Sequence, residues 1–235
     1  MERLSQISQH FESQSTKFTA NNFAHVQQAP ADPILSLSVN FKNDKDTRKV
    51  NLGVGAYRDN NGKPYVFPIV RKVEQEIVND VTLDKEYAPI EGVAEFITGA
   101  KMVLFGWEHP DVTSGRVATM QSLSGTGALR VLAEFLNKHR KAPIYLSKPT
   151  WSNHPQIFGA AGLEVREYTY YDPKTKGLNL PGMLNDLANA QSGSIVLLHT
   201  SAHNPTGVDP TPEQWHEIAK VMKENNLFPF FDTAY

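Results

Sequence analysis

The segment Ser124-Gly-Thr-Gly127 follows a predicted strand and opens a predicted helix. The first N–H groups of a helix have no partners within it and the helix dipole is positive there, so this end favours an anion such as a phosphate. Gly125 lets the backbone approach the anion closely, and Ser124 and Thr126 add hydroxyl donors. The alternative is an ordinary helix cap with a tight turn. Arg130 stands where a dinucleotide fingerprint needs its third glycine, and the Gly-Lys-Ser/Thr of a P-loop is missing.

A carboxylate and an indole stand at the ends of two other predicted strands. Asp232 ends the apolar run 227–232, and a buried carboxylate is costly unless it meets a cation or several donors. A protonated ring nitrogen of a ligand is one such partner, and a helix N-terminus or an arginine is the alternative. Trp151 could stack on a planar aromatic ligand, or it could simply fill the core.

The segment 199–207 carries two histidines and an amide. His199 and His203 are four residues apart, a spacing that suits a metal only on a helix, and Asn204-Pro205 disfavours a helix here. We therefore predict no metal site. The Asn204 side chain could donate to a phenolic oxygen, and an ordinary Asn-Pro turn is the alternative. No Gly-x-Ser-x-Gly elbow supports a hydrolase triad.

The elements that must position these residues alternate between strand and helix. The predicted strands are 117–123, 143–147, 164–171, 195–199 and 227–232, and the predicted helices are 34–41, 70–81, 92–105, 128–139, 153–161, 180–190 and 212–225. Earlier, 50–57 is a short β-type segment that leads into a turn at 59–62. This alternation predicts an α/β fold with a largely parallel, doubly wound sheet and helices on both faces.

Ligands of such sheets lie beyond the carboxyl ends of the strands. The anion site, the indole, the amide and the carboxylate all follow predicted strands. Together they predict a phosphorylated, aromatic and protonatable cofactor.

The composition excludes several classes of protein. With 40% hydrophobic and 20% charged residues, 235 residues suit one large α/β domain, or one domain and part of another. The net charge of -2 gives no basic surface for nucleic acid. No apolar stretch approaches the roughly 20 residues of a membrane span, and a chain without cysteine has no disulfide or thiolate site.

Residues 1–22 are predicted to be a disordered tail and not a targeting peptide, which favours the cytoplasm; a mitochondrial presequence is the alternative.

Longer motifs occur in one order and carry a family resemblance. They are Val50-Asn-Leu-Gly-Val-Gly-Ala-Tyr-Arg58, Arg71-Lys-Val-Glu74, Glu86-Tyr-Ala-Pro-Ile90, Gln121-Ser-Leu-Ser-Gly-Thr-Gly-Ala-Leu-Arg130, Pro149-Thr-Trp-Ser-Asn-His154, Ala202-His-Asn-Pro-Thr-Gly-Val-Asp-Pro-Thr-Pro-Glu-Gln-Trp215 and Phe230-Phe-Asp-Thr-Ala-Tyr235. From about Phe23 to Tyr235 the chain resembles the N-terminal half, or slightly more, of the aspartate aminotransferases. These are class I enzymes of fold type I that use pyridoxal 5'-phosphate.

The resemblance implies how this chain would hold that cofactor. Ser124, Gly125 and Thr126 would bind its phosphate, and Trp151 would stack on its pyridine ring and also contact the substrate. Asp232, a candidate catalytic residue, would pair with the ring nitrogen. Such a pair keeps the pyridinium protonated, so that the ring can accept electrons from the substrate.

The remaining site residues also come from the resemblance. Asn204 and Tyr235, the second candidate catalytic residue, would bond the phenolic oxygen, and His154 would lie behind the carboxylate that pairs with the ring nitrogen. Gly55 would lie beside the substrate, and Asn204 would also help to hold its α-carboxylate. Tyr87 would reach the cofactor phosphate of the neighbouring subunit, which implies a homodimer.

The resemblance further implies the organisation of the chain and its reaction. Residues 1–22 would be a tail, 23–64 the N-terminal arm and part of a small domain, and 65–235 a cofactor-binding large domain that is incomplete at its C-terminus. The reaction would be reversible amino-group transfer between L-aspartate and 2-oxoglutarate, giving oxaloacetate and L-glutamate.

The family's Schiff-base lysine and substrate-binding arginines would follow Tyr235, so we expect this chain to be inactive alone. Two alternatives stay open. One is an aromatic amino acid aminotransferase, and the other is a truncated, non-catalytic isoform that associates with a full-length subunit.

Overall fold

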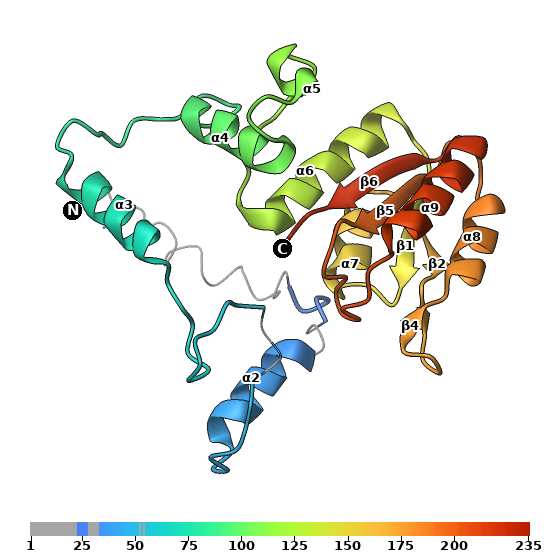
Figure 1. The fold of residues 1–235 in the computed structure, drawn as a ribbon, viewed down its shortest axis with the longest axis horizontal. Helices are drawn as coiled ribbons and strands as arrows, with labels where there is room; N and C mark the ends of the chain where they lie inside the picture. Colours follow the sequence, from blue (N-terminus) through green and yellow to red (C-terminus); the bar gives the residue numbers. More distant parts are fainter. Residues whose placement is uncertain (1–22, 28–32, 52, 54) are drawn as a thin grey trace, which may run out of the picture. The chain divides into compact units, whose positions relative to one another are not determined.

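A computed structural model of the chain describes residues 23–27, 33–51, 53 and 55–235 (Figure 1). Contacts divide the chain into two units, Met1–Lys85 and Glu86–Tyr235, and each is described by itself. The tail predicted at 1–22 lies outside the described residues. The domain boundary predicted between residues 64 and 65 falls within the first unit and stays a prediction.

Two helices of the first unit confirm the helices predicted at 34–41 and 70–81. They are α2 (Pro33–Asn43) and α3 (Pro68–Asn79). Proline opens α3, because its fixed φ suits the first helical turn and its missing N–H is not needed there.

The segment 50–57 does not form the predicted strand in its described residues. The pairing nearby is one isolated bridge between Arg58 and Pro64. It frames the predicted turn at 59–62, which is confirmed because the Gly62 N–H donates to the Asp59 carbonyl at 2.9 Å. A single bridge provides too few hydrogen bonds between segments to form a stable strand.

The second unit is built on a four-stranded parallel sheet with the strand order β2-β1-β5-β6 (Figure 1). Its strands are β1 (Ile144–Lys148), β2 (Val165–Thr169), β5 (Ile195–His199) and β6 (Phe228–Asp232), with a separate hairpin of β3 (Tyr171–Asp172) and β4 (Gly177–Leu178). Its helices are α4 (Ala94–Phe105), α5 (Pro110–Thr113), α6 (Ser124–His139), α7 (Asn153–Ala160), α8 (Leu180–Ala188) and α9 (Pro212–Glu224). Among the described residues, no helix is long and apolar enough to cross a membrane.

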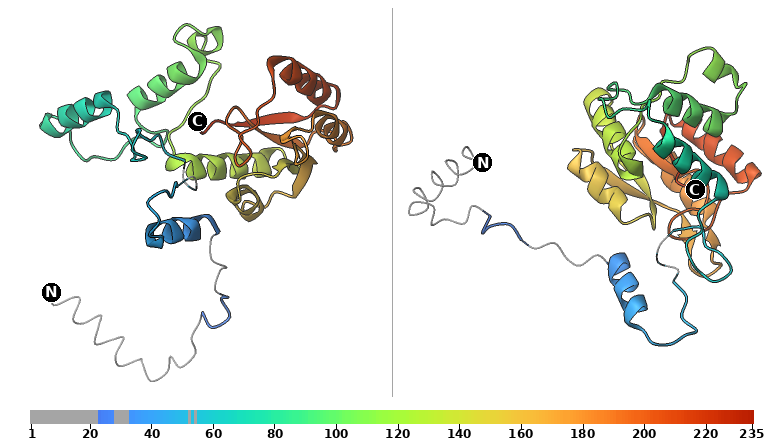
Figure 2. Two further views of the ribbon diagram at one scale, coloured as in Figure 1. Left: turned by 60° about the horizontal axis from the view of Figure 1, so that its bottom comes forward. Right: turned by 90° about the vertical axis from the view of Figure 1, so that its left-hand side faces the viewer.

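Strands β1, β2 and β5 send side chains into two separate cores on opposite faces of the sheet. Ile144 and Leu146 pack on the face covered by α6 and α7, whereas Tyr145, between them, packs on the face covered by α8 and α9. Figure 2 shows the two helix pairs on opposite sides of the sheet. Because successive strand residues point to opposite faces, a sheet covered on both sides needs continuous apolar runs such as β5. The predicted doubly wound α/β fold is confirmed.

The strand predicted at 117–123 is absent. Those residues lie outside any helix or strand, most of them are exposed, and within the described part of the chain no strand pairs with them. A β-type pattern becomes a strand only where a neighbouring strand takes up its backbone hydrogen bonds. Instead, α6 begins directly at Ser124, earlier than the residue 128 that apolar spacing predicted.

Replacing Phe158 of α7 with alanine should destabilise the second unit by about 3–5 kcal/mol. Its side chain is fully buried and lies edge-on to Phe230 of β6, with ring centroids 5.7 Å apart. The measurement is the free energy of unfolding in urea. Phe135→Ala is the matched control, because that ring on α6 is 57% exposed; equal losses in the two variants would contradict the predicted packing effect.

Candidate active site

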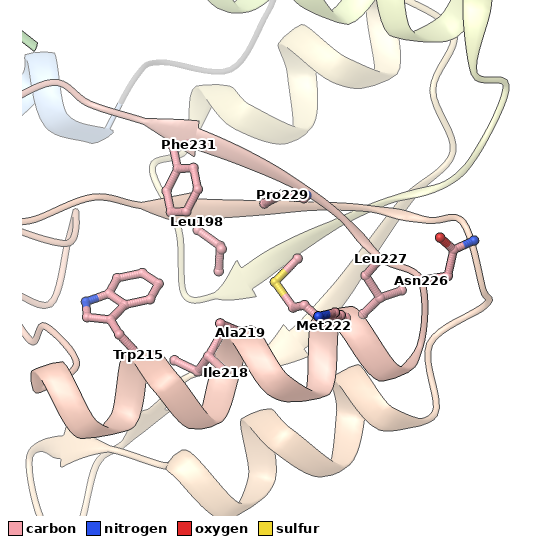
Figure 3. A pocket seen from close by; sticks show the side chains of 10 residues that line it. Leu198, Trp215, Ile218, Ala219, Met222, Asn226, Leu227, Pro229 and Phe231 are labelled. Atoms are coloured by element: carbon pink, nitrogen blue, oxygen red, sulfur yellow. The ribbon is translucent and has the colours of Figure 1, made fainter. Parts of the chain in front are cut away.

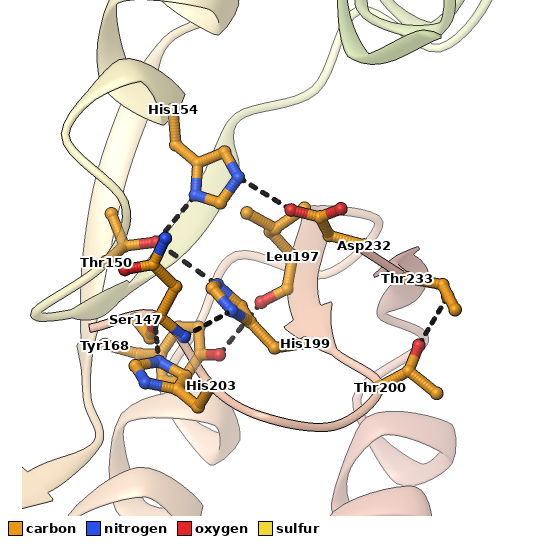
Figure 4. Close-up of polar contacts among 11 residues, drawn as sticks. Ser147, Thr150, His154, Tyr168, Leu197, His199, Thr200, His203, Asp232 and Thr233 are labelled. Carbon is orange, nitrogen blue, oxygen red and sulfur yellow. Dashed lines mark hydrogen bonds and ion pairs between the residues drawn. The ribbon is translucent and has the colours of Figure 1, made fainter. Parts of the chain in front are cut away.

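The carboxyl ends of the strands bring the candidate polar residues together (Figure 4). The register of β5 and β6 places His199 beside Asp232, each the last residue of its strand. The chain after β1 supplies Thr150 and Trp151 and then enters α7, which carries His154 in its first turn. Parallel strands end at one edge of the sheet, so segments far apart in sequence meet here.

His154 and Asp232 form the central pair. The imidazole Nε2 lies 3.0 Å from Asp232 Oδ2; the histidine side chain is fully buried and that of Asp232 is 20% exposed. The hydrogen bond from His154 lowers the pKa of Asp232, although burial opposes this shift. The structure thus places His154 behind a carboxylate that stays ionised at neutral pH.

A chain of hydrogen bonds fixes which way the His154 ring donates. The backbone N–H of Asn204 donates to His199 Nδ1 at 3.2 Å, so the ring proton of neutral His199 is on Nε2. That nitrogen lies 3.3 Å from Thr150 Oγ1, and Thr150 Oγ1 lies 2.7 Å from His154 Nδ1. His199 therefore donates to Thr150 and Thr150 donates to His154, which leaves the other His154 nitrogen to donate to Asp232.

Burial keeps the second and third histidines of this cluster neutral. It lowers the pKa of His199 to about 4. It also lowers the pKa of His203 to about 3. Both nitrogens of each of these two rings already have hydrogen-bond partners. In the part of the chain that the structure describes, no group of three His, Asp or Glu side chains is arranged to hold a metal.

The first turn of α6 presents the predicted anion site. Because α6 leads into β1 and packs along the sheet, it runs against the strand direction, and its N-terminus lies toward the strand ends (Figure 1). The residue before the helix is Leu123, which cannot cap it, so the ordinary side-chain cap is not formed. Ser124 adopts a φ of 62°, and a Cβ at Gly125 would meet no atom within 4 Å. The backbone here is open to an incoming group.

The other predicted residues take varied positions. The Trp151 ring is partly buried and stands perpendicular to the His154 ring, with centroids 5.3 Å apart. Tyr235 is 64% exposed, and its carbonyl accepts a hydrogen bond from the Ser201 hydroxyl at 3.4 Å. Tyr87 is exposed on the second unit, and Gly55 is exposed on the first unit.

One cavity of the described chain is lined by none of these residues. It has a volume of about 400 Å³ and lies between α9 and the sheet (Figure 3). Its lining includes Leu198, Trp215, Ile218, Met222, Leu227 and Phe231. Lys223 and Asn226 also line it, but the lining holds no carboxylate that could pair with a ring nitrogen, so we place the chemistry at Asp232 and not in this cavity.

Sequence reasoning missed two members of the hydrogen-bond chain, Thr150 and His199. His199 was considered only as a metal ligand paired with His203. Its place as the last residue of a buried strand, like that of Asp232, was a usable signal, because such residues lie at the ligand-binding edge of the sheet. Thr150 carried no comparable signal, since it follows a Lys-Pro turn.

This chain is similar to known proteins over most of its length. Residues 47–235 match the family described as aminotransferase class I and II. The chloroplastic aspartate aminotransferase 3 of Arabidopsis thaliana and the cytoplasmic aspartate aminotransferase of rice are each 53% identical over 214 residues. These alignments cover 91% of this chain but 48% and 53% of the relatives. The chain therefore spans about half the length of the curated relatives it matches.

Solved structures show the same fold. The cytoplasmic aspartate aminotransferase of Saccharomyces cerevisiae is 42% identical with a TM-score of 0.86, covering 92% of this chain and 53% of the yeast protein. The aromatic amino acid aminotransferase of Burkholderia pseudomallei, covalently bound to pyridoxal phosphate, is 43% identical with a TM-score of 0.87, covering 92% and 54%. With a family match over most of its length and this shared fold, the chain belongs to the class I and II aminotransferases.

Proposed function

We propose that this chain is the cofactor-binding half of a pyridoxal-phosphate-dependent aspartate aminotransferase. The observation that carries the proposal is the ionised carboxylate of Asp232, held by His154 at the strand ends toward which the open first turn of α6 also faces. A carboxylate suits the protonated ring nitrogen of a phosphorylated pyridine, and an uncapped helix N-terminus suits its phosphate.

The donor set fits that cofactor. His154 occupies one oxygen of Asp232, and a fifth of the side chain is still exposed, which leaves room for a protonated ring nitrogen. Phosphate oxygens accept hydrogen bonds, and Ser124, Gly125 and Thr126 supply hydroxyl and backbone donors at a positive helix end. When bound, the cofactor supplies an electron sink for the substrate's α-carbon.

The protein's own residues would hold and polarise this ring. Asp232 would keep the ring nitrogen protonated, and His154, fixed by Thr150 and His199, would keep Asp232 ionised and oriented. Trp151 would cover one face of the ring.

The remaining assignments rest on the resemblance. Asn204 and Tyr235 would donate to the phenolic oxygen of the cofactor, and Gly55 and Asn204 would contact the substrate. Tyr87 would act on the phosphate of a neighbouring subunit, so the proposed functional form is a homodimer.

The proposed reaction exchanges an amino group between L-aspartate and 2-oxoglutarate, giving oxaloacetate and L-glutamate. The names of the plant and yeast relatives support it. The Burkholderia relative favours a second candidate, an aromatic amino acid aminotransferase. Steady-state rates of the full-length protein with aspartate and with phenylalanine decide between them. A higher kcat/KM for aspartate is expected, and the reverse order would overturn the substrate assignment.

A truncated, non-catalytic isoform is a separate candidate. The intact mass of the native protein distinguishes it: a value near 26.2 kDa supports a short form, and a value well above it supports the longer enzyme. For the compartment we propose the cytoplasm, as in the name of the rice relative, with an organelle as the alternative. A fluorescent fusion of the native protein tests this.

Replacing Thr126 with valine should raise the dissociation constant of pyridoxal phosphate by roughly tenfold or more, because a hydrogen bond to a charged phosphate is lost. The measurement is a binding titration with residues 1–235. Pyridoxal, which has no phosphate, should bind the two proteins equally. Thr98→Val is the control, since Thr98 is an exposed residue of α4. Equal pyridoxal phosphate affinity for wild type and Thr126→Val would contradict the phosphate site.

A further inference from the structure

The loop between β5 and α9 directs three consecutive backbone N–H groups onto side-chain acceptors. The Ala202 N–H donates to Asp209 Oδ2 at 2.7 Å, and the His203 N–H donates to Asp209 Oδ1 at 3.0 Å. The next N–H, that of Asn204, donates to His199 Nδ1 at 3.2 Å. One carboxylate thus holds the two peptide groups immediately before the one that contacts His199.

The His203 side chain anchors the same loop from inside. It is 1% exposed, its Nε2 lies 2.9 Å from Ser147 Oγ of β1, and its Nδ1 lies 2.7 Å from Thr206 Oγ1. Its ring stacks on Tyr170, with centroids 3.9 Å apart and planes 13° apart. This buried ring is fixed on both edges and on one face, so the backbone at 203 has little freedom to move.

The loop is closed on its far side as well. The Gly207 N–H donates to the His203 carbonyl at 2.7 Å, and the Tyr170 hydroxyl donates to the Val208 carbonyl at 2.6 Å. Ala202 has a φ of 49°, in the left-handed region that L-residues seldom adopt. An alanine keeps this conformation only when its surroundings impose it, and here the Asp209 carboxylate bonded to its N–H does so.

We propose that Asp209 and His203 are positioning residues: they hold the Asn204 N–H on His199 and thereby set the donor direction of the hydrogen-bond chain that ends on Asp232. The catalytic importance of this positioning rests on the proposed function, whereas the hydrogen bonds themselves are present in the protein without cofactor. Asp209 lies outside this chain of donors and is exposed, so it acts through the loop backbone.

The test is nuclear magnetic resonance of isotopically labelled residues 1–235 without cofactor. Wild type should show a scalar coupling across the hydrogen bond between the Asn204 amide nitrogen and His199 Nδ1, with the His199 proton on Nε2. In Asp209→Ala this coupling should vanish, the His199 Nδ1 resonance should move to that of a nitrogen without a donor, and Asn204 amide exchange should accelerate by about tenfold or more. A merely structural role would leave the His199 nitrogen resonances unchanged.

Asp172→Ala is the matched control. Asp172, the last residue of β3, also accepts a backbone N–H, that of Lys174 at 2.9 Å, but in the separate β3–β4 hairpin. It should leave the Asn204 and His199 signals unchanged. If Asp209→Ala does not fold, Thr206→Val, which removes the hydroxyl beside His203 Nδ1, should weaken the same coupling.

An unchanged coupling and exchange rate in folded Asp209→Ala, or in Thr206→Val when the former does not fold, would overturn the inference. The outcome is separable from the proposed function. If the coupling behaves as expected but pyridoxal phosphate does not bind, the cofactor assignment fails and the positioning role stands.

Discussion

Replacing Asp232 with alanine should lower the turnover number of the full-length enzyme by about 150-fold to 5,000-fold. The side chain is the carboxylate to which His154 donates at the described strand ends. Removing one partner of a buried, hydrogen-bonded charge pair costs roughly 3–5 kcal/mol, and each 1.36 kcal/mol on a barrier is tenfold in rate. Without this counter-charge the ring nitrogen would lose its proton, and the cofactor would be a weaker electron sink.

The measurement is single-turnover and steady-state kinetics with aspartate. Asp172→Ala serves as the control, because that carboxylate belongs to the last residue of β3, in the separate β3–β4 hairpin, and should not alter the rate. Asp232→Glu should retain part of the activity, since the charge is kept and only its position changes. A turnover number in Asp232→Ala within a factor of two of wild type would refute the assignment of Asp232.

Acidification should weaken the second unit well before its carboxylates are protonated. Burial lowers the pKa of His199 to about 4 and that of His203 to about 3, whereas both would titrate near 6.5 in the unfolded chain. Above about pH 6.5 both rings are neutral in both states, and their contribution to stability is complete. As the pH falls from about 6.5 toward 4, these histidines bind protons in the unfolded chain but not in the folded protein, so the free energy of unfolding decreases.

Between pH 6.5 and pH 4 the free energy of unfolding should fall by on the order of 3 kcal/mol through His199 alone, at 1.36 kcal/mol for each pKa unit. His203 adds to it, although the two rings interact, with centroids 4.3 Å apart, and the losses are not additive. Asp232 adds a stability loss at still lower pH. Its pKa is lowered in the folded protein, so its contribution to the free energy of unfolding is complete above the ordinary aspartate pKa near 3.8 and decreases below it.

Urea unfolding between about pH 7 and pH 4 measures this dependence. His199→Gln should flatten the curve, whereas His216→Gln, which replaces an exposed histidine of α9, should keep it. A wild-type stability that stays level from pH 7 to pH 4 would show that these histidines are not buried as neutral groups.

The local pattern of apolar residues predicted most strands of the second unit. The runs at 143–147 and 195–199 became β1 and β5, because residues buried on both faces of a parallel sheet must be apolar throughout. The run at 227–232 became β6, although Phe230 is the only residue of that strand that is buried. The same reasoning failed at 117–123, where the pattern is similar and no strand pairs with it in the described chain. Periodicity reports which side chains can be buried, but pairing depends on what lies beside them.

The sequence by itself determined the α/β class, most elements of the second unit, and Asp232 and Ser124–Thr126 as the residues to examine. Tertiary structure alone decided that His199 and Thr150 connect Asn204 to His154. The contact of Thr150 with His199 joins residues 49 positions apart, and that of His154 with Asp232 joins residues 78 positions apart, which no local spacing relates. A hydrogen bond depends on a few tenths of an ångström and on which nitrogen carries the proton. Only the assembled sheet edge, with the loop at 200–209 folded against it, sets both.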